Sequence, residues 1–485
     1  MSSEKEDRVL ILFFKMFLLM KNNNLTMKGL NLCINSQTPL IRFKLQYSEL
    51  IEKYGDLPDP LPLGMLIEGE DYEMTPGGVP KIVYPLMNKM IKENLVENAH
   101  WISLNPVGPE RVSTDKVLIH NISLGSQEVS AYSRMKERIW EEVHDLERHE
   151  VGPKEFAVYA KYNWLCATKM FELLPIDVFY IHDFQQLQIG NMIGLAAPTV
   201  FRWHIPFDLT RIYPYMRNFI VRCMEAFDAV VVSCRRDLEG LIRAGYHGRA
   251  YQVYPCVDDK RWSEPTSSDV DKFCQTFGIG TDDRMVLVVG RMDKIKGQDI
   301  AVKAISQLTR NFPNLKLVLV GNGSFSGSAV GGLSHPKANV WRSYLQKLVK
   351  NLKLEKNVVF TGYLPDELLR AAYKRAEVLV LPSVKEGFGL VAGEAWIYKK
   401  PVIVSTEAGV SEMIIEGTNG YTFESGDIGG LVNKLNLVLK NPEAAAVVGE
   451  RGNEMVRILS LEEGTKKVMS IFTEAVEKFE KSKPS

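Results

Sequence analysis

The chain has 485 residues, of which 45% are hydrophobic and 24% charged, which is the composition of an ordinary globular protein and enough length for two domains. Lys and Arg together number 59, as do Asp and Glu, so there is no overall positive field to hold a nucleic acid. The six cysteines lack the spacing of a zinc site or a disulfide framework, which predicts reduced thiols in a cytoplasmic protein.

The amino-terminal segment is strongly apolar between Val9 and Met20. This run is too short to span a bilayer, Lys15 interrupts it, and no small-residue cleavage site precedes the polar residues 21–24. We therefore predict that residues 1–26 are an extension outside the fold rather than a membrane anchor.

Strand-like and helical patterns alternate through the first half of the chain. A first buried strand is expected at Gly29–Ile34, and helices are expected over residues 127–149 and 154–172. Further strand-like runs lie at residues 116–120, 178–181, 199–203 and 229–232. This alternation predicts an α/β domain with a doubly wound parallel sheet over residues 27–262.

A glycine pair, Gly77 and Gly78, precedes a helix that Pro85 is expected to open and that continues to about Leu95. Because glycine has no Cβ, the backbone of such a turn can approach a ligand closely. The turn is therefore a candidate ligand contact, although a plain tight turn would contain the same residues.

Two polar clusters follow predicted strands. The first, His-Asp-Phe, covers residues 182–184, and the second, His-Ile-Pro-Phe, covers residues 204–207. Ligands of parallel sheets bind beyond the carboxyl ends of the strands, so we expect both clusters to face an active site. Both stretches resemble those of trehalose-6-phosphate synthases, a group of enzymes with the GT-B fold. That resemblance implies that Asp183 binds acceptor hydroxyls and that His204 contacts the donor glucose.

A second domain is expected over residues 263–459, and it begins with a linker and short helix rich in Ser, Thr and Asp that extend to Asp283. Its first strand, Met285–Gly290, leads to Arg291 and Lys296, and a helix is predicted from Gln298. Two cations beside a helix amino terminus would bind a diphosphate through both charge and helix dipole. A solvated basic turn is the alternative interpretation.

A long polar stretch at residues 324–340 predicts either a functional flap or a disordered loop, followed by a helix over residues 341–352. The strand and loop at residues 358–365 resemble those that bracket the nucleotide base in family-four glycosyltransferases, which implies a similar position here. A last helix is expected within residues 460–485.

The most informative motif is residues 379–394, where a strand ends at Pro382 and a helix is expected to open near Leu390. Glu386 lies in the turn between them, and Glu394 lies in the helix. The unpaired N–H groups of such a turn suit a phosphate, and carboxylates accept hydrogen bonds from sugar hydroxyls. The motif therefore predicts a nucleotide-sugar site, although an ordinary charged turn could also contain two glutamates.

The spacing Glu-x7-Glu within Pro-Ser-x-x-Glu-Gly-Phe-Gly resembles the donor signature of retaining family-four glycosyltransferases, which have the GT-B fold. The resemblance implies two Rossmann-like doubly wound domains that face each other across a cleft, with the last helix crossing back to the first domain. It covers most of residues 27–480. The chain departs from the family pattern at the expected hinge, residues 251–258, where Cys256 replaces an Asn-Gly pair.

The resemblance also assigns roles. In the family, the first Glu meets the donor sugar, the second meets the ribose, and the turn between them binds the diphosphate. The donor-binding residues predicted in this way are Gly77, Gly78, Arg291, Lys296, Glu386, Gly387, Phe388, Gly389, Leu390 and Glu394. The predicted catalytic residues are His204, Asp183, Arg291, Lys296 and Glu386. The predicted acceptor-binding residues are Arg42, His182, Asp183 and Arg211, and no metal ligand is expected.

These assignments predict a retaining enzyme that moves glucose from a nucleoside diphosphate glucose, such as UDP-glucose, to glucose 6-phosphate and so forms trehalose 6-phosphate. The resemblance implies a front-face route that requires no cofactor, with Mg²⁺ as a stimulant at most. The expected partners are a sugar nucleotide and a sugar phosphate, without nucleic acid or membrane, and a homo-oligomer stays open. Three alternatives remain: a trehalose glycosyltransferring synthase that uses free glucose, an enzyme acting on a lipid-linked sugar, and a catalytically silent nucleotide-sugar sensor.

Overall fold

The fold is described from a computed structural model of the chain. It describes residues 29–75, 78–114, 116–144, 146, 150–207, 211–322 and 336–483. The predictions for residues 1–26, for Gly77 and for residues 324–335 therefore lie outside the described residues.

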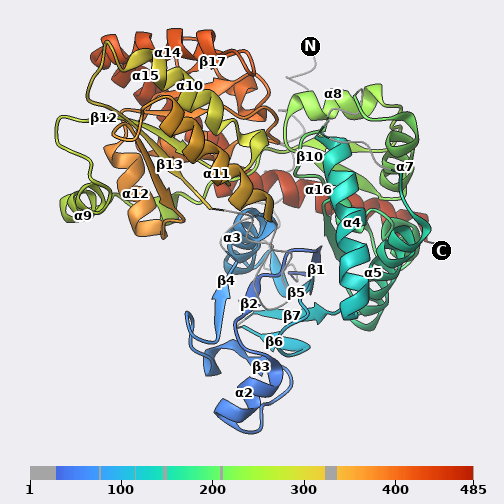
Figure 1. The fold of residues 1–485 in the computed structure, drawn as a ribbon. Coiled ribbons are helices and arrows are strands. Elements are labelled where there is room, and N and C mark those ends of the chain that lie inside the picture. The colour runs from blue at the N-terminus through green and yellow to red at the C-terminus, as the bar shows by residue number, and fades with distance from the viewer. Residues whose placement is uncertain are drawn as a thin grey trace, which may run out of the picture.

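The first half of the chain forms a nine-stranded sheet (Figure 1). Its strands are β1 (Leu30–Ser36), β3 (Leu61–Pro62), β5 (Val96–Leu104), β6 (Arg111–Ser113), β7 (Val117–Ile122), β8 (Val178–His182), β9 (Thr199–Arg202), β10 (Ala229–Val232) and β11 (Ala250–Gln252). They lie in the order β11-β10-β9-β8-β1-β5-β7-β6-β3, and all neighbours are parallel except β6 and β7. Strands β2 (Ile41–Phe43) and β4 (Tyr72–Met74) form a separate antiparallel pair.

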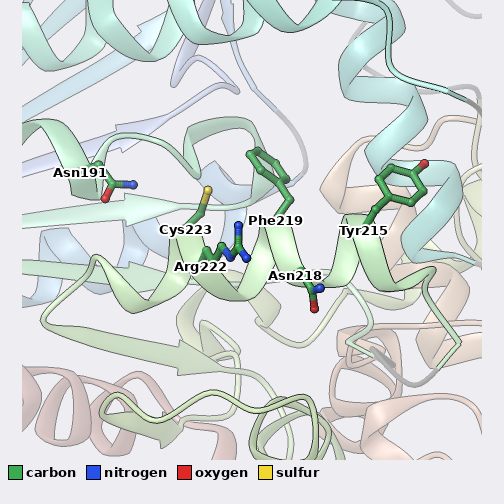
Figure 2. Close-up of a pocket in the computed structure, with 6 residues that line it drawn as sticks. All are labelled: Asn191, Tyr215, Asn218, Phe219, Arg222 and Cys223. Atoms are coloured by element: carbon green, nitrogen blue, oxygen red, sulfur yellow. The ribbon is translucent and has the colours of Figure 1, made fainter.

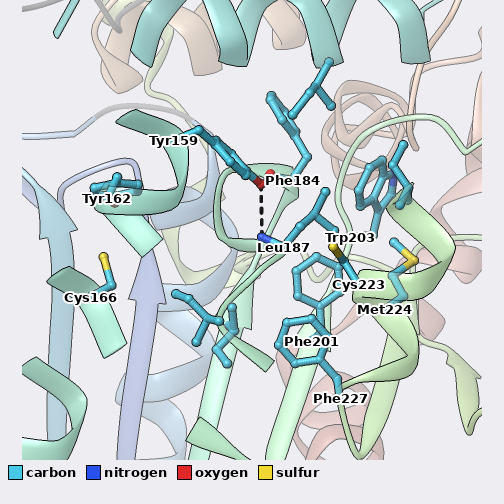
Figure 3. Close-up of a cluster of buried hydrophobic side chains, with 14 of the residues drawn as sticks. Tyr159, Tyr162, Cys166, Phe184, Leu187, Phe201, Trp203, Cys223, Met224 and Phe227 are labelled. Carbon is cyan, nitrogen blue, oxygen red and sulfur yellow. Dashed lines mark hydrogen bonds between the residues drawn. The ribbon is translucent and has the colours of Figure 1, made fainter. Parts of the chain in front are cut away.

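Two apolar clusters cover the two faces of this sheet. The helices of this half are α2 (Tyr47–Tyr54), α3 (Val79–Lys92), α4 (Ser126–Val143), α5 (Pro153–Glu172), α6 (Gly190–Ile193), α7 (Pro214–Glu225) and α8 (Arg235–Arg243), with 3-10 turns η1 (Leu63–Met65), η2 (Phe184–Gln186) and η3 (Asp259–Trp262). One cluster joins α4, α5 and α7 to the sheet, and within it the Leu187 N–H donates to the Tyr159 hydroxyl at 3.3 Å (Figure 3). The other cluster lies under α3. Because both faces are covered, most of the strands are continuous apolar runs in the sequence.

Two details of this half differ from the sequence predictions. Pro85 lies inside α3 rather than at its start, because the helix begins at Val79 with Pro80 in its first turn. The apolar face of α3, which buries Val83 and Leu86, holds the interior proline in place. Central strand β5 was not predicted, because its first half reads Val-Glu-Asn-Ala-His.

The second half forms a six-stranded parallel sheet. Its strands are β12 (Arg284–Val289), β13 (Leu315–Val320), β14 (Val358–Gly362), β15 (Val378–Leu381), β16 (Val402–Ser405) and β17 (Tyr421–Phe423). The order β14-β13-β12-β15-β16-β17 is the Rossmann order, and the central strands β7-β5-β1-β8-β9-β10 of the first sheet repeat it. The strand order therefore reverses between β1 and β8 and between β12 and β15. Ligands of such sheets bind beyond these points.

The second sheet is covered on both faces by helices and by two further apolar clusters. These helices are α9 (Ser267–Phe277), α10 (Gln298–Leu308), α11 (Pro336–Asn351), α12 (Asp366–Arg375), α13 (Leu390–Ile397), α14 (Ile428–Lys440) and α15 (Pro442–Met455), with 3-10 turns η4 (Lys294–Lys296), η5 (Gly409–Met413) and η6 (Val456–Leu459). Helix α11 begins earlier than predicted, so residues 336–340 are helical and do not belong to a polar loop. A proline suits the first position of a helix, where its missing N–H would be unpaired anyway.

The last helix, α16 (Leu461–Ser482), lies against the first sheet and not the second (Figure 1). Its Phe472 side chain is fully buried and meets Tyr180 of β8 edge to face, with ring centroids 5.1 Å apart. Among the helices that the structure describes, none is both long and apolar enough to cross a membrane.

Candidate active site

The turn between β15 and α13 contains the Glu-x7-Glu motif. Gly389 begins the helix with φ 98°, a conformation that L-residues with side chains rarely adopt, and a Cβ there would lie 2.5 Å from the Leu381 side chain. Within the turn, the Ser383 hydroxyl donates to Glu386 Oε2 at 3.1 Å. The glycine therefore sets the path of the turn, and the serine orients the first glutamate.

Lys296 and Glu386 form an ion pair across the two switch-point loops of the second sheet. Lys296 Nζ lies 2.5 Å from Glu386 Oε2, and both side chains are about one-sixth exposed. The adjacent Arg291 carbonyl accepts a hydrogen bond of 2.6 Å from Gln298, the first residue of α10. Within the described residues, the Arg291 guanidinium has no polar partner. The loop between β12 and α10 thus presents two cations, Arg291 without an ion-pair partner among the described residues and Lys296 paired with Glu386.

Two histidines at the ends of β8 and β9 contact each other. His182 Nδ1 and His204 Nε2 are 3.0 Å apart, and the His204 N–H donates to Asp183 Oδ1 at 2.8 Å. Removal from water, and then the nearby Arg202 charge, lower the pKa of both imidazoles well below the ordinary value. Burial raises the pKa of Asp183 from 3.8 to about 7. Both rings are therefore neutral at pH 7, and the carboxyl titrates near it.

Asp183 also has an unusual backbone conformation. Its φ of 68° and ψ of 171° fall in a region that is essentially restricted to glycine, and such strain persists only where the surroundings enforce it. The Asp183 N–H donates to the carbonyl of Arg202 on the neighbouring strand at 2.9 Å. Strain of this kind clusters at functional sites. Together with its burial, the strained backbone makes Asp183 a strong candidate for an active-site residue.

The two halves of the molecule meet at Gly387. A Cβ on this residue would lie 2.4 Å from the His204 carbonyl oxygen, so only glycine allows this approach. Contacts therefore run without a break from Lys296 through Glu386 and Gly387 to His204 and Asp183. Predicted residues from both sheets lie in one place.

Glu394, the second glutamate of the motif, is 2% exposed in α13. Its Oε2 accepts a hydrogen bond of 2.7 Å from the Tyr373 hydroxyl. Its Oε1 lies 2.7 Å from Nζ of Lys81, which belongs to α3 of the first domain. Lys81 follows the glycine pair by three residues, and the sequence prediction missed it.

Three other predicted site residues lie outside the set of contacts from Lys296 to Asp183. Arg42 lies in β2, directly opposite Glu73, and no polar contact joins it to the histidine pair within the described residues. Arg211 lies 3.9 Å from Glu407 of the second domain. Gly78 has φ 69° and precedes α3, with the side chain of Thr38 nearby.

The middle of the turn between β15 and α13 continues into the helix. Phe388 is 4% exposed and packs against Tyr254, with ring centroids 5.4 Å apart. Leu390 begins α13 directly after Gly389. This part of the turn is thus fixed by packing on the apolar cluster beneath it.

Lys136 of α4 and His144, the residue directly after α4, lie within electrostatic range of the loop between β12 and α10, and the sequence prediction missed both. His144 Nδ1 lies 2.7 Å from the Trp140 carbonyl, and the two rings stack at 4.1 Å. Burial and the nearby cations, among them Lys296 and Arg291, lower the pKa of His144 to about 3. Burial and Arg291 lower the pKa of Lys136 to about 8. The spacing of four residues between Lys136, Trp140 and His144 was the available signal.

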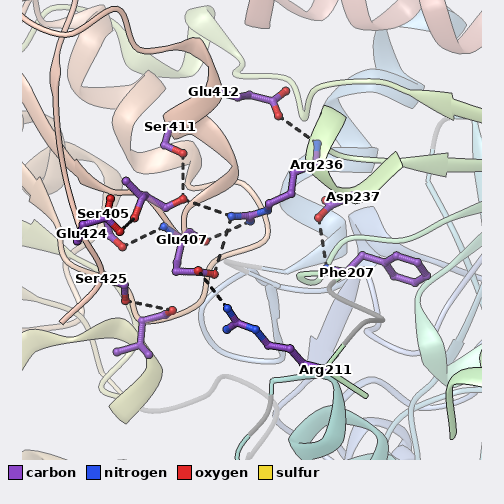
Figure 4. A network of polar contacts seen from close by, with 12 residues as sticks. Phe207, Arg211, Arg236, Asp237, Ser405, Glu407, Ser411, Glu412, Glu424 and Ser425 are labelled. Atoms are coloured by element: carbon purple, nitrogen blue, oxygen red, sulfur yellow. Dashed lines mark hydrogen bonds and ion pairs between the residues drawn. The ribbon is translucent and has the colours of Figure 1, made fainter. Parts of the chain in front are cut away.

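A polar network around Arg236, Glu407 and Glu412 joins the two domains (Figure 4). Glu412 of η5 accepts hydrogen bonds from the first two N–H groups of α8, those of Arg235 at 2.9 Å and Arg236 at 3.4 Å. Its other oxygen accepts from the Tyr254 hydroxyl at 2.8 Å. The Arg236 guanidinium donates in turn to the carbonyls of Thr406 and Glu407. A carboxylate of one domain thus caps a helix of the other.

A hollow of about 430 Å³ elsewhere on the first domain contains none of the predicted residues (Figure 2). Its lining comes from α6, which contributes Asn191, and from α7, which contributes Tyr215, Asn218, Phe219, Arg222 and Cys223. Because none of these lining residues comes from the end of a strand, the hollow is not the candidate site.

Two family models match the chain. The model of glycosyl transferases group 1 matches residues 269–455, and the model of the trehalose synthase N-terminal domain matches residues 124–238. The first span includes Arg291, Lys296 and both glutamates of the motif, and the second includes the histidine pair.

Individual proteins agree with these models. An uncharacterized glycosyltransferase of Methanocaldococcus jannaschii is 34% identical over 340 residues, which are 68% of this chain and 78% of that protein. A trehalose synthase of Pyrococcus horikoshii is 22% identical over 386 residues, 79% of this chain and 83% of its own. Among solved structures, a UDP-forming α,α-trehalose-phosphate synthase of Burkholderia xenovorans superposes with a TM-score of 0.69 at 16% identity, over 91% of this chain and 98% of that one.

Proposed function

The chain belongs to the group 1 glycosyl transferases and has the predicted GT-B fold, and on this premise we propose that it transfers glucose from a nucleoside diphosphate glucose to glucose 6-phosphate. The product would be trehalose 6-phosphate. Trehalose chemistry is supported by the match to the trehalose synthase N-terminal domain and by the similarity to the Pyrococcus protein. The Burkholderia neighbour, which is UDP-forming, supports a UDP-sugar as donor.

The observation that carries the proposal is the unbroken set of contacts from Lys296 to Asp183. It brings Lys296, a cation that suits a phosphate, and Glu386, a carboxylate that suits sugar hydroxyls, close to Asp183, a carboxylate of the other domain. A transfer between two sugars needs such groups around one point, because the donor and the acceptor must react in contact.

Departure of the diphosphate is the difficult step, and the cations Arg291 and Lys296 would stabilise the charge that develops on it, together with the N–H groups of the turn. Glu386 would release Lys296 to the phosphate and accept hydrogen bonds from hydroxyls of the donor glucose. Glu394 would bind the ribose, and His204 would contact the glucose. Each group acts on charge or orientation, and none is proposed as a covalent nucleophile.

In the proposed reaction, the bond between the anomeric carbon and the phosphate oxygen breaks, and a bond to the acceptor oxygen forms on the same face. The acceptor hydroxyl loses its proton to an oxygen of the departing diphosphate, so atoms and charge balance without an external base. Asp183 would orient the acceptor through its hydroxyls. The configuration at the anomeric carbon would be retained.

Free glucose is a second candidate acceptor. The specific support for it is the trehalose synthase model, together with the Pyrococcus relative. Arg42 and Arg211 are the cations proposed for the phosphate of glucose 6-phosphate, and neither lies in the contact chain that ends at Asp183.

The test incubates the protein with UDP-, ADP- or GDP-glucose and with glucose 6-phosphate or glucose, and identifies the products by mass. We expect a disaccharide phosphate from one donor. The variants Arg291→Ala and Glu386→Ala should each lose about two to three orders of magnitude in kcat/KM, which is typical for groups that stabilise a transition state. Lys294→Ala, at an exposed lysine of the same loop, is the matched control and should keep wild-type activity. Variants of Arg291 and Glu386 within twofold of wild type would refute the assignment.

A further inference from the structure

Lys81 and Glu394 form an ion pair that joins the two domains at the position proposed for the ribose. Lys81 Nζ lies 2.7 Å from Glu394 Oε1, and the side chains are 24% and 3% exposed respectively. The ammonium also lies 5.4 Å from the centre of the Trp262 ring. This pair is independent of the contacts among Lys296, Glu386 and His204.

The exposed fractions of Tyr373 and Lys81 show which of these two partners of Glu394 lies in the domain interior and which lies towards solvent. Tyr373, which donates to Oε2, is fully buried, so it holds Glu394 from the interior of the second domain. Lys81 is the more exposed partner, and it reaches the other oxygen from α3 of the first domain. The lysine therefore covers the side of the carboxylate from which a ligand would arrive.

We propose that Lys81 occupies the place of the ribose diol in the donor-free protein, and that a nucleoside diphosphate binds by displacing it from Glu394. This inference rests on the proposed function, because it takes Glu394 as the ribose-binding carboxylate. The ligand class is a nucleotide with vicinal hydroxyls, which can replace the ammonium as donors to Oε1.

Removing Lys81 affects the free protein more than the complex. In the free protein, Lys81→Met leaves a buried carboxylate with Tyr373 as its remaining partner, and a buried charge without its partner is unfavourable. In the complex, ribose hydroxyls satisfy the same oxygen. Since the free state is destabilised and the bound state is not, nucleotide affinity must rise by linkage.

The test measures binding by titration calorimetry for the wild type, Lys81→Met and Lys89→Met. Lys89 is the matched control, because it lies on the same helix but pairs at 2.6 Å with Glu93, the residue that follows the helix. The probes are UDP, ADP, GDP and inorganic pyrophosphate, which engages the diphosphate cations but has no ribose. For the nucleotide that the wild type binds, Lys81→Met should lower Kd by about three- to tenfold. The Kd of Lys81→Met for pyrophosphate should stay unchanged. Lys89→Met should keep the wild-type Kd for both the nucleotide and pyrophosphate.

Two further measurements separate displacement from simple damage. Lys81→Arg keeps a cation and should bind nucleotide as the wild type does. Without ligand, Lys81→Met should show a larger radius of gyration in small-angle scattering, because one contact between the domains is lost.

An unchanged or weaker nucleotide affinity in Lys81→Met would overturn the proposal. A weaker pyrophosphate affinity would do the same, because it would make Lys81 a phosphate ligand. Failure of the proposed function gives a different result: no glucosyl product forms while Lys81→Met still tightens nucleotide binding.

Discussion

Replacing Asp183 by Asn should remove activity and yet stabilise the protein at alkaline pH. The substitution keeps the shape of the side chain and an oxygen that accepts the His204 N–H, which Asp183 Oδ1 contacts at 2.8 Å. Asn also tolerates a positive φ about as well as Asp does, so the backbone at φ 68° adds little difference. What the substitution removes is the charge.

The magnitude follows from the pKa of Asp183, which burial raises from 3.8 to about 7. Because this pKa is higher in the folded than in the unfolded protein, the folded state binds more protons between these two values. Its stability therefore falls as the pH rises through that window. A difference of about three pKa units corresponds to a loss of about 4 kcal/mol of folding stability above pH 7, of which about 1.6 kcal/mol remains at pH 5.

The assay is thermal or urea unfolding of Asp183→Asn and wild type at pH 8 and pH 5, followed through the first domain. At pH 8 the variant should melt higher by on the order of 10 °C, and the gap should shrink at pH 5. Asp59→Asn is a control of opposite sign, because Arg111 lowers the pKa of the exposed Asp59 carboxyl. A variant that is no more stable than wild type at pH 8, or a gap that does not change with pH, would refute the reasoning.

Two other substitutions test the packing that brings the halves together. Gly387→Ala places a Cβ 2.4 Å from the His204 carbonyl oxygen, so we expect kcat/KM to fall by more than about tenfold through misplacement of the donor turn. Gly64→Ala, where nothing lies within 4 Å, should leave steady-state kinetics unchanged, and equal activity in both variants would contradict the close approach. Phe472→Ala should lower the free energy of unfolding by about 3–5 kcal/mol, because it removes a fully buried ring from the contact between α16 and β8. Urea unfolding measures this loss, and a change below about 1 kcal/mol would show that α16 is not anchored there.

Motifs at strand ends were predictable from the sequence because their chemistry is local. The turn around Glu386 follows an apolar run and leads into a helix, and both histidines follow apolar runs in the same way. The fold class followed from the alternation of strands and helices, and it is confirmed. Glu386 and the two histidines could therefore be named as candidate site residues from the sequence alone.

Residues that act across the domain boundary were not predictable in the same way. Lys81 meets Glu394 across 313 positions of the chain, and no local pattern indicates that contact. Lys136 and His144 did have helical spacing, but besides burial their pKa values are lowered by the charge of Arg291, which belongs to the other domain. Strand β5 was missed for a different reason, since its polar first half hides a central strand.

The most direct test of the whole account is a crystal structure of the protein with the nucleoside diphosphate that it binds. We predict the diphosphate at Arg291 and Lys296, the ribose hydroxyls on Glu394, and Lys81 displaced from that carboxylate. Nucleotide bound elsewhere, for instance in the hollow beside Phe219, would contradict the account.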